Sequence, residues 1–180
     1  MLVLLGAVAL TIVLAAAAAT FVVEHAQEQD EQHEIRTQLA DDMSASLADA
    51  VGTARLAARG DVQEPVQRQA LVAWTAAAGR IEAELAGRFP GADVLRQWRG
   101  YGRAVDAYLR LGGPTNERES LLGYLSSYGR AAGVVWGHLA PPSGLTTGSE
   151  FQTAYAQVGT WLLRRGGELV RLVLSLDPNV

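Results

Sequence analysis

The sequence predicts an all-α protein, in which an N-terminal transmembrane helix continues into an up-and-down bundle of four or five helices. Three observations lead to this fold class. The chain begins with a long uncharged run, from Leu2 to Val23. Apolar residues then recur three and four positions apart, which is the spacing of one helix face. Stretches rich in Gly and Pro separate these segments, and no alternating strand pattern competes with them.

The uncharged run is long enough to cross a bilayer. About 22 residues correspond to roughly 33 Å of helix, and the hydrocarbon core is roughly 30 Å thick. A cleaved secretory signal is the alternative, because the alanine run Ala15 to Ala19 offers a cleavage site. However, no basic residue precedes the run, and the run continues to Val23. We therefore expect an uncleaved anchor over residues 1–23.

The basic residues give little guidance on orientation. All 15 of them are arginines, a bias typical of a GC-rich bacterial genome, and none precedes Arg36. The positive-inside rule, by which basic residues near a span face the cytoplasm, therefore gives no orientation here, because almost no basic residue flanks the span. The simplest topology is a single-pass protein of the cell membrane, with a cytoplasmic N-terminus and an extracytoplasmic C-terminal domain over residues 35–180.

A polar segment follows the predicted anchor. Residues 24–34 consist of Glu, Gln, Ala, Asp and His, without Gly or Pro. Several of these residue types favour helix, so we expect a polar helical stalk over 24–34. The first apolar stripe of the bundle then ends at Gly60. Its members are Ile35, Leu39, Met43, Leu47, Ala50, Val51 and Ala54.

The second and third bundle helices have clear boundaries. Pro65 suits the first turn of the second helix, and the sequence Phe89-Pro90-Gly91 closes that helix. The third helix shows coiled-coil spacing and stops at the Gly-Gly-Pro sequence that begins at Gly112. The second stripe is Val66, Ala70, Ala73, Trp74, Ala77, Ile81 and Leu85, and the third is Val94, Trp98, Tyr101, Val105 and Tyr108.

The fourth and fifth helices each open with a capping-box pattern. Asn116 with Glu119 begins the fourth, and Thr147 with Glu150 begins the fifth. The apolar stripe of the fifth helix is interrupted at residues 164–167 (Arg-Arg-Gly-Gly), where we expect a bend or break. Residues 169–176 then form either a buried helical end or a short strand, and we favour helix. The two stripes are Leu121, Leu125, Tyr128, Ala132, Val135 and Leu139, and Phe151, Tyr155, Val158 and Leu162.

Glycines on the fourth helix indicate a packing surface. Each Gly costs about 1 kcal/mol relative to Ala inside a helix, so a row of them indicates close approach of another backbone. The partner is either a neighbouring helix of the same bundle, another subunit or a ligand. The apolar C-terminal segment and two tryptophans add further surface. The interface candidates are Gly129, Gly133, Gly137, Trp136, Trp161, Leu169, Leu172 and Leu176.

Aromatic residues on the inner stripes offer a second kind of site. They could line a pocket for an apolar or cationic small molecule. The alternative is core packing, in which their polar atoms find hydrogen-bond partners within the protein. The pocket candidates are Trp74, Trp98, Tyr101, Tyr108 and Tyr128.

The residue inventory argues against catalysis. Without Cys there are no disulfides, thiol nucleophiles or Cys-based metal sites. His25 and His33 lie about 12 Å apart along a helix, too far to bind one ion unaided. No nucleophile–base arrangement and no basic stripe for nucleic acid is visible. We therefore expect a non-enzymatic protein without cofactor, metal or nucleic-acid partner.

Two functions remain. The first is an accessory or scaffold subunit of a membrane protein complex. Its partners would be membrane lipid and other membrane protein subunits, or further copies of the same chain. The alternative is a membrane-tethered sensory or ligand-binding bundle. The architecture resembles the extracytoplasmic four-helix sensor bundles of bacterial receptors, which also follow a membrane helix. Those receptors return through a second span, and no second span is predicted here.

Overall fold

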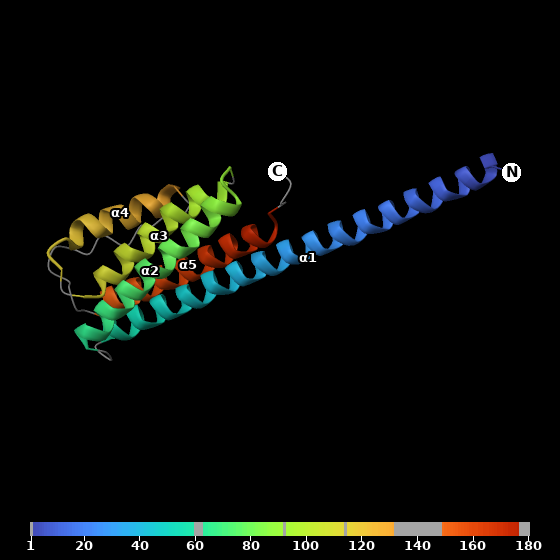
Figure 1. Ribbon diagram of the computed structural model, residues 1–180. Helices are drawn as coiled ribbons and strands as arrows, with labels where there is room; N and C mark the ends of the chain where they lie inside the picture. The colour runs from blue at the N-terminus through green and yellow to red at the C-terminus, as the bar shows by residue number, and fades with distance from the viewer. Residues whose placement is uncertain (1, 60–62, 92, 114, 132–148, 177–180) are drawn as a thin grey trace. The chain divides into compact units, whose positions relative to one another are not determined.

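The protein is all-helical throughout the part of the chain that the structure describes (Figure 1). The computed structural model describes the backbone of residues 2–59, 63–91, 93–113, 115–131 and 149–176, and their side chains except 2–25, 57–58, 131 and 149–150. The helices are α1 (Leu2–Arg59), α2 (Glu64–Arg88), α3 (Asp93–Leu111), α4 (Arg118–Ala131) and α5 (Ser149–Leu174). No strand occurs in these ranges, so the predicted fold class is confirmed at the level of a helical bundle.

The chain divides into two compact units, Met1–Gln38 and Leu39–Val180. In the first unit, residues 26–34 are helical and almost all exposed. No helix built from the described residues combines the length and the apolar character that a bilayer crossing requires. The span predicted over residues 1–23 falls on side chains outside that set, so it stays a prediction.

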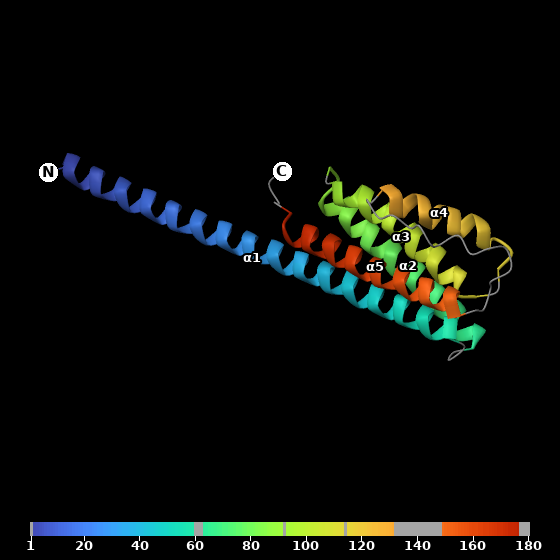
Figure 2. The same cartoon turned by 180° about the vertical axis from the view of Figure 1, so that it is seen from behind.

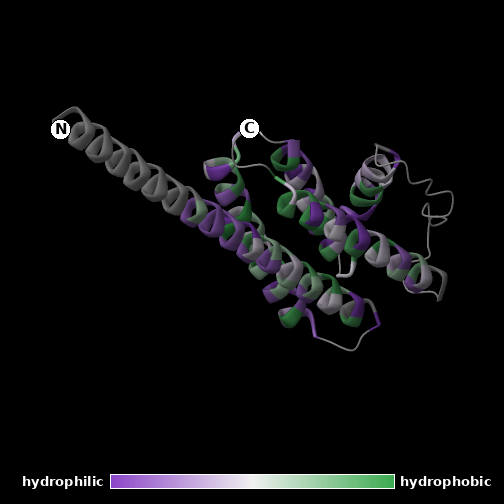
Figure 3. Cartoon of the chain, turned by 90° about the vertical axis from the view of Figure 1, so that its right-hand side faces the viewer, coloured by the Kyte–Doolittle hydropathy of each residue, from purple (hydrophilic) through white to green (hydrophobic). Residues whose placement is uncertain are grey.

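In the second unit, α3 is the central helix. It packs against α2, α4 and α5, and Figures 1 and 2 show it between α4 and the rest of the bundle. The predicted stripe of α3 is buried, but so are residues on its other sides, because neighbours cover it from three directions. The apolar faces of the helices turn toward one another (Figure 3). The additional buried residues of α3 are Leu95, Ala104, Ala107, Leu109 and Leu111.

The second half of α1 lies alongside α5 (Figures 1 and 2). The predicted stripe from Leu39 to Ala54 is buried, and α1 ends at Arg59, next to Gly60 as expected. The two helices are antiparallel. Leu47 lies against Gly166 of α5, whereas Arg55, further along α1, donates a hydrogen bond to the Ala156 carbonyl near the start of α5.

The predicted inner face of α2 is wrong in its first turn. Val66 is 45% exposed, whereas its neighbour Gln67 is only 8% exposed. Ala73 is exposed as well, while Ala70, Trp74, Ala77, Ile81 and Leu85 are buried. Hydropathy favoured the valine, but Gln67 points inward because its side-chain amide donates a hydrogen bond to the Leu109 carbonyl of α3 at 3.0 Å.

The predicted break in the fifth helix is also wrong. Helix α5 continues through Gly166 and Gly167 to Leu174, so the favoured helical reading of the segment from Leu169 is confirmed. A glycine pair weakens an isolated helix, but here Gly166 is buried against α1 and α3. The tertiary contact therefore outweighs the local preference.

The ends of the fourth and fifth helices are only partly described. Helix α4 begins at Arg118, and the Thr115 hydroxyl accepts a hydrogen bond from the Glu117 N–H at 3.1 Å. Thr115 therefore provides a side-chain bond at this end, where Asn116 was expected to do so. The stripe residues Ala132, Val135 and Leu139, and the capping residue Thr147, lie outside the described residues.

Candidate functional site

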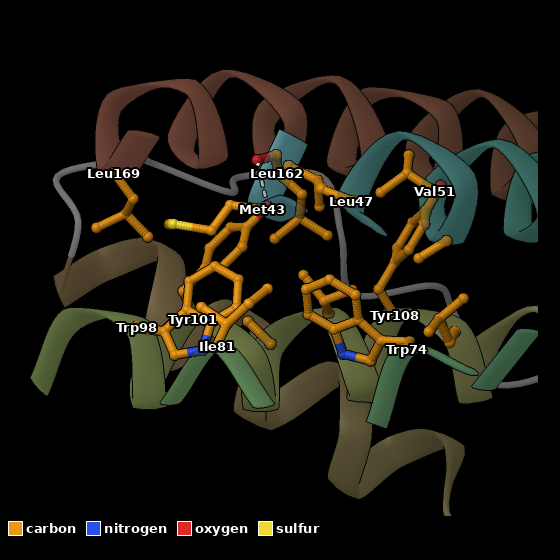
Figure 4. Close-up of a cluster of buried hydrophobic side chains, with 14 of the residues drawn as sticks. Met43, Leu47, Val51, Trp74, Ile81, Trp98, Tyr101, Tyr108, Leu162 and Leu169 are labelled. Carbon is orange, nitrogen blue, oxygen red and sulfur yellow. Dashed lines mark hydrogen bonds between the residues drawn. The ribbon is translucent and has the colours of Figure 1, made fainter. Parts of the chain in front are cut away.

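The interface between α3 and α5 is built from tyrosine hydroxyls that bond to backbone carbonyls. Tyr101 and Tyr108 lie two turns apart on one face of α3. The Tyr101 hydroxyl donates to the Leu162 carbonyl at 2.9 Å, and the Tyr108 hydroxyl donates to the Tyr155 carbonyl at 3.1 Å. In return, the Tyr155 hydroxyl donates to the Tyr108 carbonyl at 2.7 Å. Figure 4 shows Tyr101, Tyr108 and Leu162 within the buried cluster.

Glycines make room for these hydroxyls. A Cβ atom at Gly159 would lie 2.5 Å from the Tyr108 hydroxyl oxygen, and one at Gly166 would lie 2.7 Å from that of Tyr101. A Cβ at Gly112 would lie 2.7 Å from the hydroxyl of Tyr155. In each case the glycine follows the accepting residue by four positions. Side chains in a helix lean toward its N-terminus, so a side chain at that position would cover the carbonyl.

Gln67 follows the same rule at the α2–α3 contact. Its amide nitrogen donates to the Leu109 carbonyl, and a Cβ at Gly113, four positions later, would lie 3.0 Å from that nitrogen. The less buried contacts do not need glycine. The Tyr124 hydroxyl donates to the Gly100 carbonyl at 3.2 Å, with Ala104 four positions on. The fully buried side-chain-to-carbonyl hydrogen bonds between helices are therefore the ones that require a glycine four positions after the acceptor.

Burial keeps these phenols protonated. It raises the pKa of Tyr101 and Tyr155 well above the ordinary value of 10.0. Burial also raises the pKa of Tyr108 to about 12, although the neighbouring Arg55 guanidinium opposes the shift. The hydroxyls are thus held as neutral hydrogen-bond donors, which suits a packing role and not acid–base chemistry at neutral pH.

The predicted pocket aromatics are packed against one another. Trp74 and Trp98 have ring centroids 6.0 Å apart, and Trp98 and Tyr101 have centroids 5.7 Å apart. The Trp98 indole N–H donates to the Ala78 carbonyl at 3.1 Å. Trp74, Trp98, Tyr101 and Tyr108 are all buried (Figure 4). The bundle itself therefore covers their surfaces, and the polar groups of Trp98, Tyr101 and Tyr108 bond to its backbone.

Tyr128, the fifth pocket candidate, lies in a half-buried cluster between α4 and α5. It meets Trp161 edge to face, with centroids 5.4 Å apart. Arg165 adds a hydrogen bond to the Gln97 side chain of α3 at 2.8 Å and an ion pair with Glu168 at 2.6 Å. Burial raises the pKa of Tyr128, and the charge of Arg165 opposes this. The cluster joins three helices of the bundle.

The predicted interface residues fall into three groups. Gly129 is buried within the bundle, and Gly133, Trp136 and Gly137 lie outside the described residues. Trp161 and Leu169 are buried in the core. Leu172 and Leu176 are half-buried and pack against the core. Those of the eight that the structure describes therefore spend most of their apolar surface inside the bundle.

One cleft, of about 730 Å³, lies between the start of α2 and the end of α3. Gln67 lines it together with charged residues of both signs. Glu64 pairs with Arg68 at 2.5 Å, and Arg110 lies 3.8 Å from Glu117. Because these charges pair with one another, the cleft has no strong preference for a charged ligand.

A second cleft, of about 600 Å³, lies between the end of α1 and the first turns of α5. Arg55 and Arg59 line it, together with amide and hydroxyl side chains, and none of the described residues that line it is acidic. The described residues contain no group of His, Asp or Glu that could hold a metal ion. The pocket candidates Trp74, Trp98, Tyr101, Tyr108 and Tyr128 line neither cleft.

Sequence reasoning did not single out Arg55, Arg59 or Gly159, and it considered Gly166 only as part of an expected bend or break. The only available signal was local. Arg55 directly follows the buried stripe residue Ala54, and Gly159 and Gly166 lie two turns apart, as Tyr101 and Tyr108 do. The chain matches no protein-family model, no curated protein sequence and no solved structure. Its function must therefore be argued from its own residues.

Proposed function

We propose that this chain is a non-enzymatic, single-pass membrane protein whose helical bundle acts as an accessory or scaffold domain in a membrane protein complex. Residues 1–23 would anchor it, with the N-terminus in the cytoplasm and residues 35–180 outside. The partners would be lipid, other membrane subunits or further copies of the chain.

The use of the buried polar groups carries the proposal. The hydroxyls of Tyr101, Tyr108 and Tyr155 each bond to a backbone carbonyl of the facing helix. Polar groups in a ligand site converge on a hollow, whereas these converge on neighbouring helices. These hydrogen bonds between helices support the role of a rigid scaffold. They argue against the alternative function, a receptor for an apolar or cationic ligand.

Support for the anchor comes from the sequence and the helix boundaries. Residues 2–23 carry no charge, and α1 begins at Leu2 and continues without a break to Arg59. A charge at the centre of a membrane helix costs about 2.5–3.5 kcal/mol on the insertion scale. The anchor is therefore sensitive to one well-placed substitution.

The first experiment compares Val13→Arg with Val72→Arg in the full chain. Val13 lies in the middle of the predicted span, and Val72 lies on the exposed side of α2, where it is 64% exposed. The proposal expects the unchanged chain and Val72→Arg to stay in the membrane pellet after carbonate extraction, and Val13→Arg to be released in part. Quantitative release of the unchanged chain would rule out the anchor.

A second experiment tests the scaffold role. The full chain with a C-terminal tag is extracted in mild detergent and captured, and the co-purifying proteins are quantified. The proposal expects membrane proteins in fixed stoichiometry, or a homo-oligomer of defined size. A chain that runs as a lone monomer after capture would contradict the scaffold role while leaving the anchor intact.

A further inference from the structure

The cleft between the end of α1 and the start of α5 has an unusual charge balance. Arg55 and Arg59 contribute two positive charges, and Gln152, Thr153, Gln157 and Thr160 contribute amide and hydroxyl groups. Among the described residues no carboxylate lines this cleft, although the whole chain has a formal net charge of −4. The first turn of α5 adds the partial positive charge of a helix N-terminus.

Arg55 is a half-buried cation without a counter-ion among the described residues. Arg165, a half-buried arginine of α5, is paired with Glu168 at 2.6 Å. Arg55 instead bonds to neutral groups, the Ala156 carbonyl and the Thr160 hydroxyl, and it lies beside the Tyr108 hydroxyl. Removing a charge from water is costly unless an opposite charge compensates it. This position therefore favours an anion from outside the chain.

The Arg55 guanidinium is also held in place. Its Nη2 atom donates to the Ala156 carbonyl at 3.1 Å and to the Thr160 hydroxyl at 2.7 Å. Gly159 permits this approach, because a Cβ there would lie 2.9 Å from the Arg55 Nε. A side chain fixed in advance loses little conformational entropy when a ligand binds. Arg59 is exposed on the same cleft and makes no ion pair within the described residues.

We propose that this cleft binds a phosphate group, with Arg55 and Arg59 as its charged ligands and the amide and hydroxyl side chains of α5 as additional donors. Two unpaired guanidinium groups match a dianion better than a carboxylate, because a phosphate monoester carries about −1.5 to −2 charges at neutral pH. Arginine forks also match the oxygen geometry of phosphate. The site is independent of the proposed scaffold role and differs in charge preference from the aromatic pocket predicted from the sequence.

The phosphate group has two sources that the cleft chemistry does not separate, a soluble phosphate or a lipid headgroup. The cleft volume of about 600 Å³ leaves room for a substituent on the phosphate. The experiment therefore uses two probes, inorganic phosphate and dihexanoylphosphatidic acid, a lipid phosphate monoester, below its micellar concentration. Both are added at neutral pH and constant ionic strength to the full chain in a non-ionic, phosphate-free detergent.

Binding is measured as the rise in melting temperature and as broadening of the phosphorus NMR line of each probe. The chain without substitution is compared with Arg59→Gln and Arg55→Gln, and with Arg80→Gln as a control. Arg80 is an exposed arginine of α2, outside the cleft. Loss of one charged ligand should raise the half-saturating probe concentration about tenfold, whereas Arg80→Gln should leave it unchanged.

Arg55→Gln removes two hydrogen bonds and lowers the melting temperature on its own, so Arg59→Gln is the decisive variant. Binding of both probes that weakens in Arg59→Gln supports a site for the phosphate group itself. Binding of the lipid probe alone, with the same weakening, supports the site and assigns its source to lipid. If neither probe binds better than chloride, or if Arg59→Gln binds as well as Arg80→Gln does, the proposal is wrong.

Discussion

Tyr108 and Tyr155 form a reciprocal pair: their rings stack with centroids 4.1 Å apart, and each hydroxyl donates to the backbone carbonyl of the other residue. The interplanar angle is 13°. Each hydroxyl also lies next to the glycine that follows its acceptor by four positions, Gly159 for Tyr108 and Gly112 for Tyr155. This pair joins α3 to α5, and substitutions in it test which interactions stabilise the fold.

Removing either hydroxyl of the pair should weaken the bundle. Tyr108→Phe and Tyr155→Phe keep the rings but lose one buried hydrogen bond each, which costs about 0.5–1.5 kcal/mol of unfolding free energy. Urea unfolding followed by far-ultraviolet circular dichroism measures this change. Tyr124→Phe is the control, because the Tyr124 hydroxyl bond is only partly buried. An equal or larger loss in the control would contradict the special role of the pair.

Alanine at the buried glycines of α5 should destabilise the protein, although alanine is the better helix former. Gly159→Ala would bring a Cβ within 2.5 Å of the Tyr108 hydroxyl oxygen, and Gly166→Ala would bring one against Leu47 and the Tyr101 hydroxyl. Such overpacking costs about 1–3 kcal/mol. The same urea unfolding experiment measures the loss.

Gly167 supplies the matched control for this prediction. It is in the same helix, but a Cβ there meets no atom within 4 Å. Gly167→Ala should therefore raise the unfolding free energy by up to about 1 kcal/mol through helix propensity alone. If Gly166→Ala raised the unfolding free energy as Gly167→Ala does, the close contact at Gly166 would be contradicted.

Stability should fall in alkaline solution. Tyr108 has a folded pKa of about 12 against 10.0 for an ordinary tyrosine, and burial also raises the pKa of Tyr101 and Tyr155. Between these values the unfolded chain releases protons that the folded chain retains, so the unfolding free energy declines as pH rises. The slope is about 1.4 kcal/mol per pH unit for each such tyrosine. The stabilising effect is fully present below about pH 10 and is lost as the pH passes the folded pKa values.

Two measurements check this pH dependence. Urea unfolding at rising pH gives the slope directly, and Tyr108→Phe should reduce it. Tyrosinate absorbance in the near ultraviolet shows how many phenols ionise in the folded chain. Ionisation of all 5 tyrosines near their ordinary pKa, with the bundle still folded, would contradict the burial argument.

The aromatic core should accept a ligand only after it has been opened. Trp74 is 2% exposed and lies against Trp98, so benzene should not raise the melting temperature of the unchanged chain. Trp74→Ala should cost about 3–5 kcal/mol and leave an apolar cavity of the kind that binds benzene. Thermal unfolding with and without benzene measures both effects. A clear benzene effect on the unchanged chain would revive the aromatic pocket.

The bundle helices were predictable because their burial repeats with the helical period. The stripe of α1 from Leu39 to Ala54 and that of α3 from Val94 to Tyr108 lie inside as expected. The predictions were wrong where contacts with another helix determined which residue is buried or whether a helix continues. Gln67 displaces Val66 from the interior through a bond to Leu109, and Gly166 stays within α5 because other helices pack on it.

The candidate sites were less predictable for the same reason. A hydrogen bond from Arg55 to Ala156 joins residues 101 positions apart. No local sequence pattern predicts a contact at that separation. Likewise, the aromatic stripes identified Trp74, Trp98, Tyr101 and Tyr108 as inward-facing, but not whether they enclose a hollow or fill one. Only the facing helices show that the polar atoms of Trp98, Tyr101 and Tyr108 already have partners.

The tyrosine–glycine contacts have a consequence for motion within the bundle. A slide of α5 along α3 by one turn, about 5.4 Å, would change the register of both tyrosines at once. In one direction Leu162 and Tyr155 would take the places of Gly166 and Gly159, and in the other direction Val170 and Leu163 would do so. Neither shift leaves room for the hydroxyls. A slide by a whole turn between these two helices is therefore closed to this domain as a way of passing a signal.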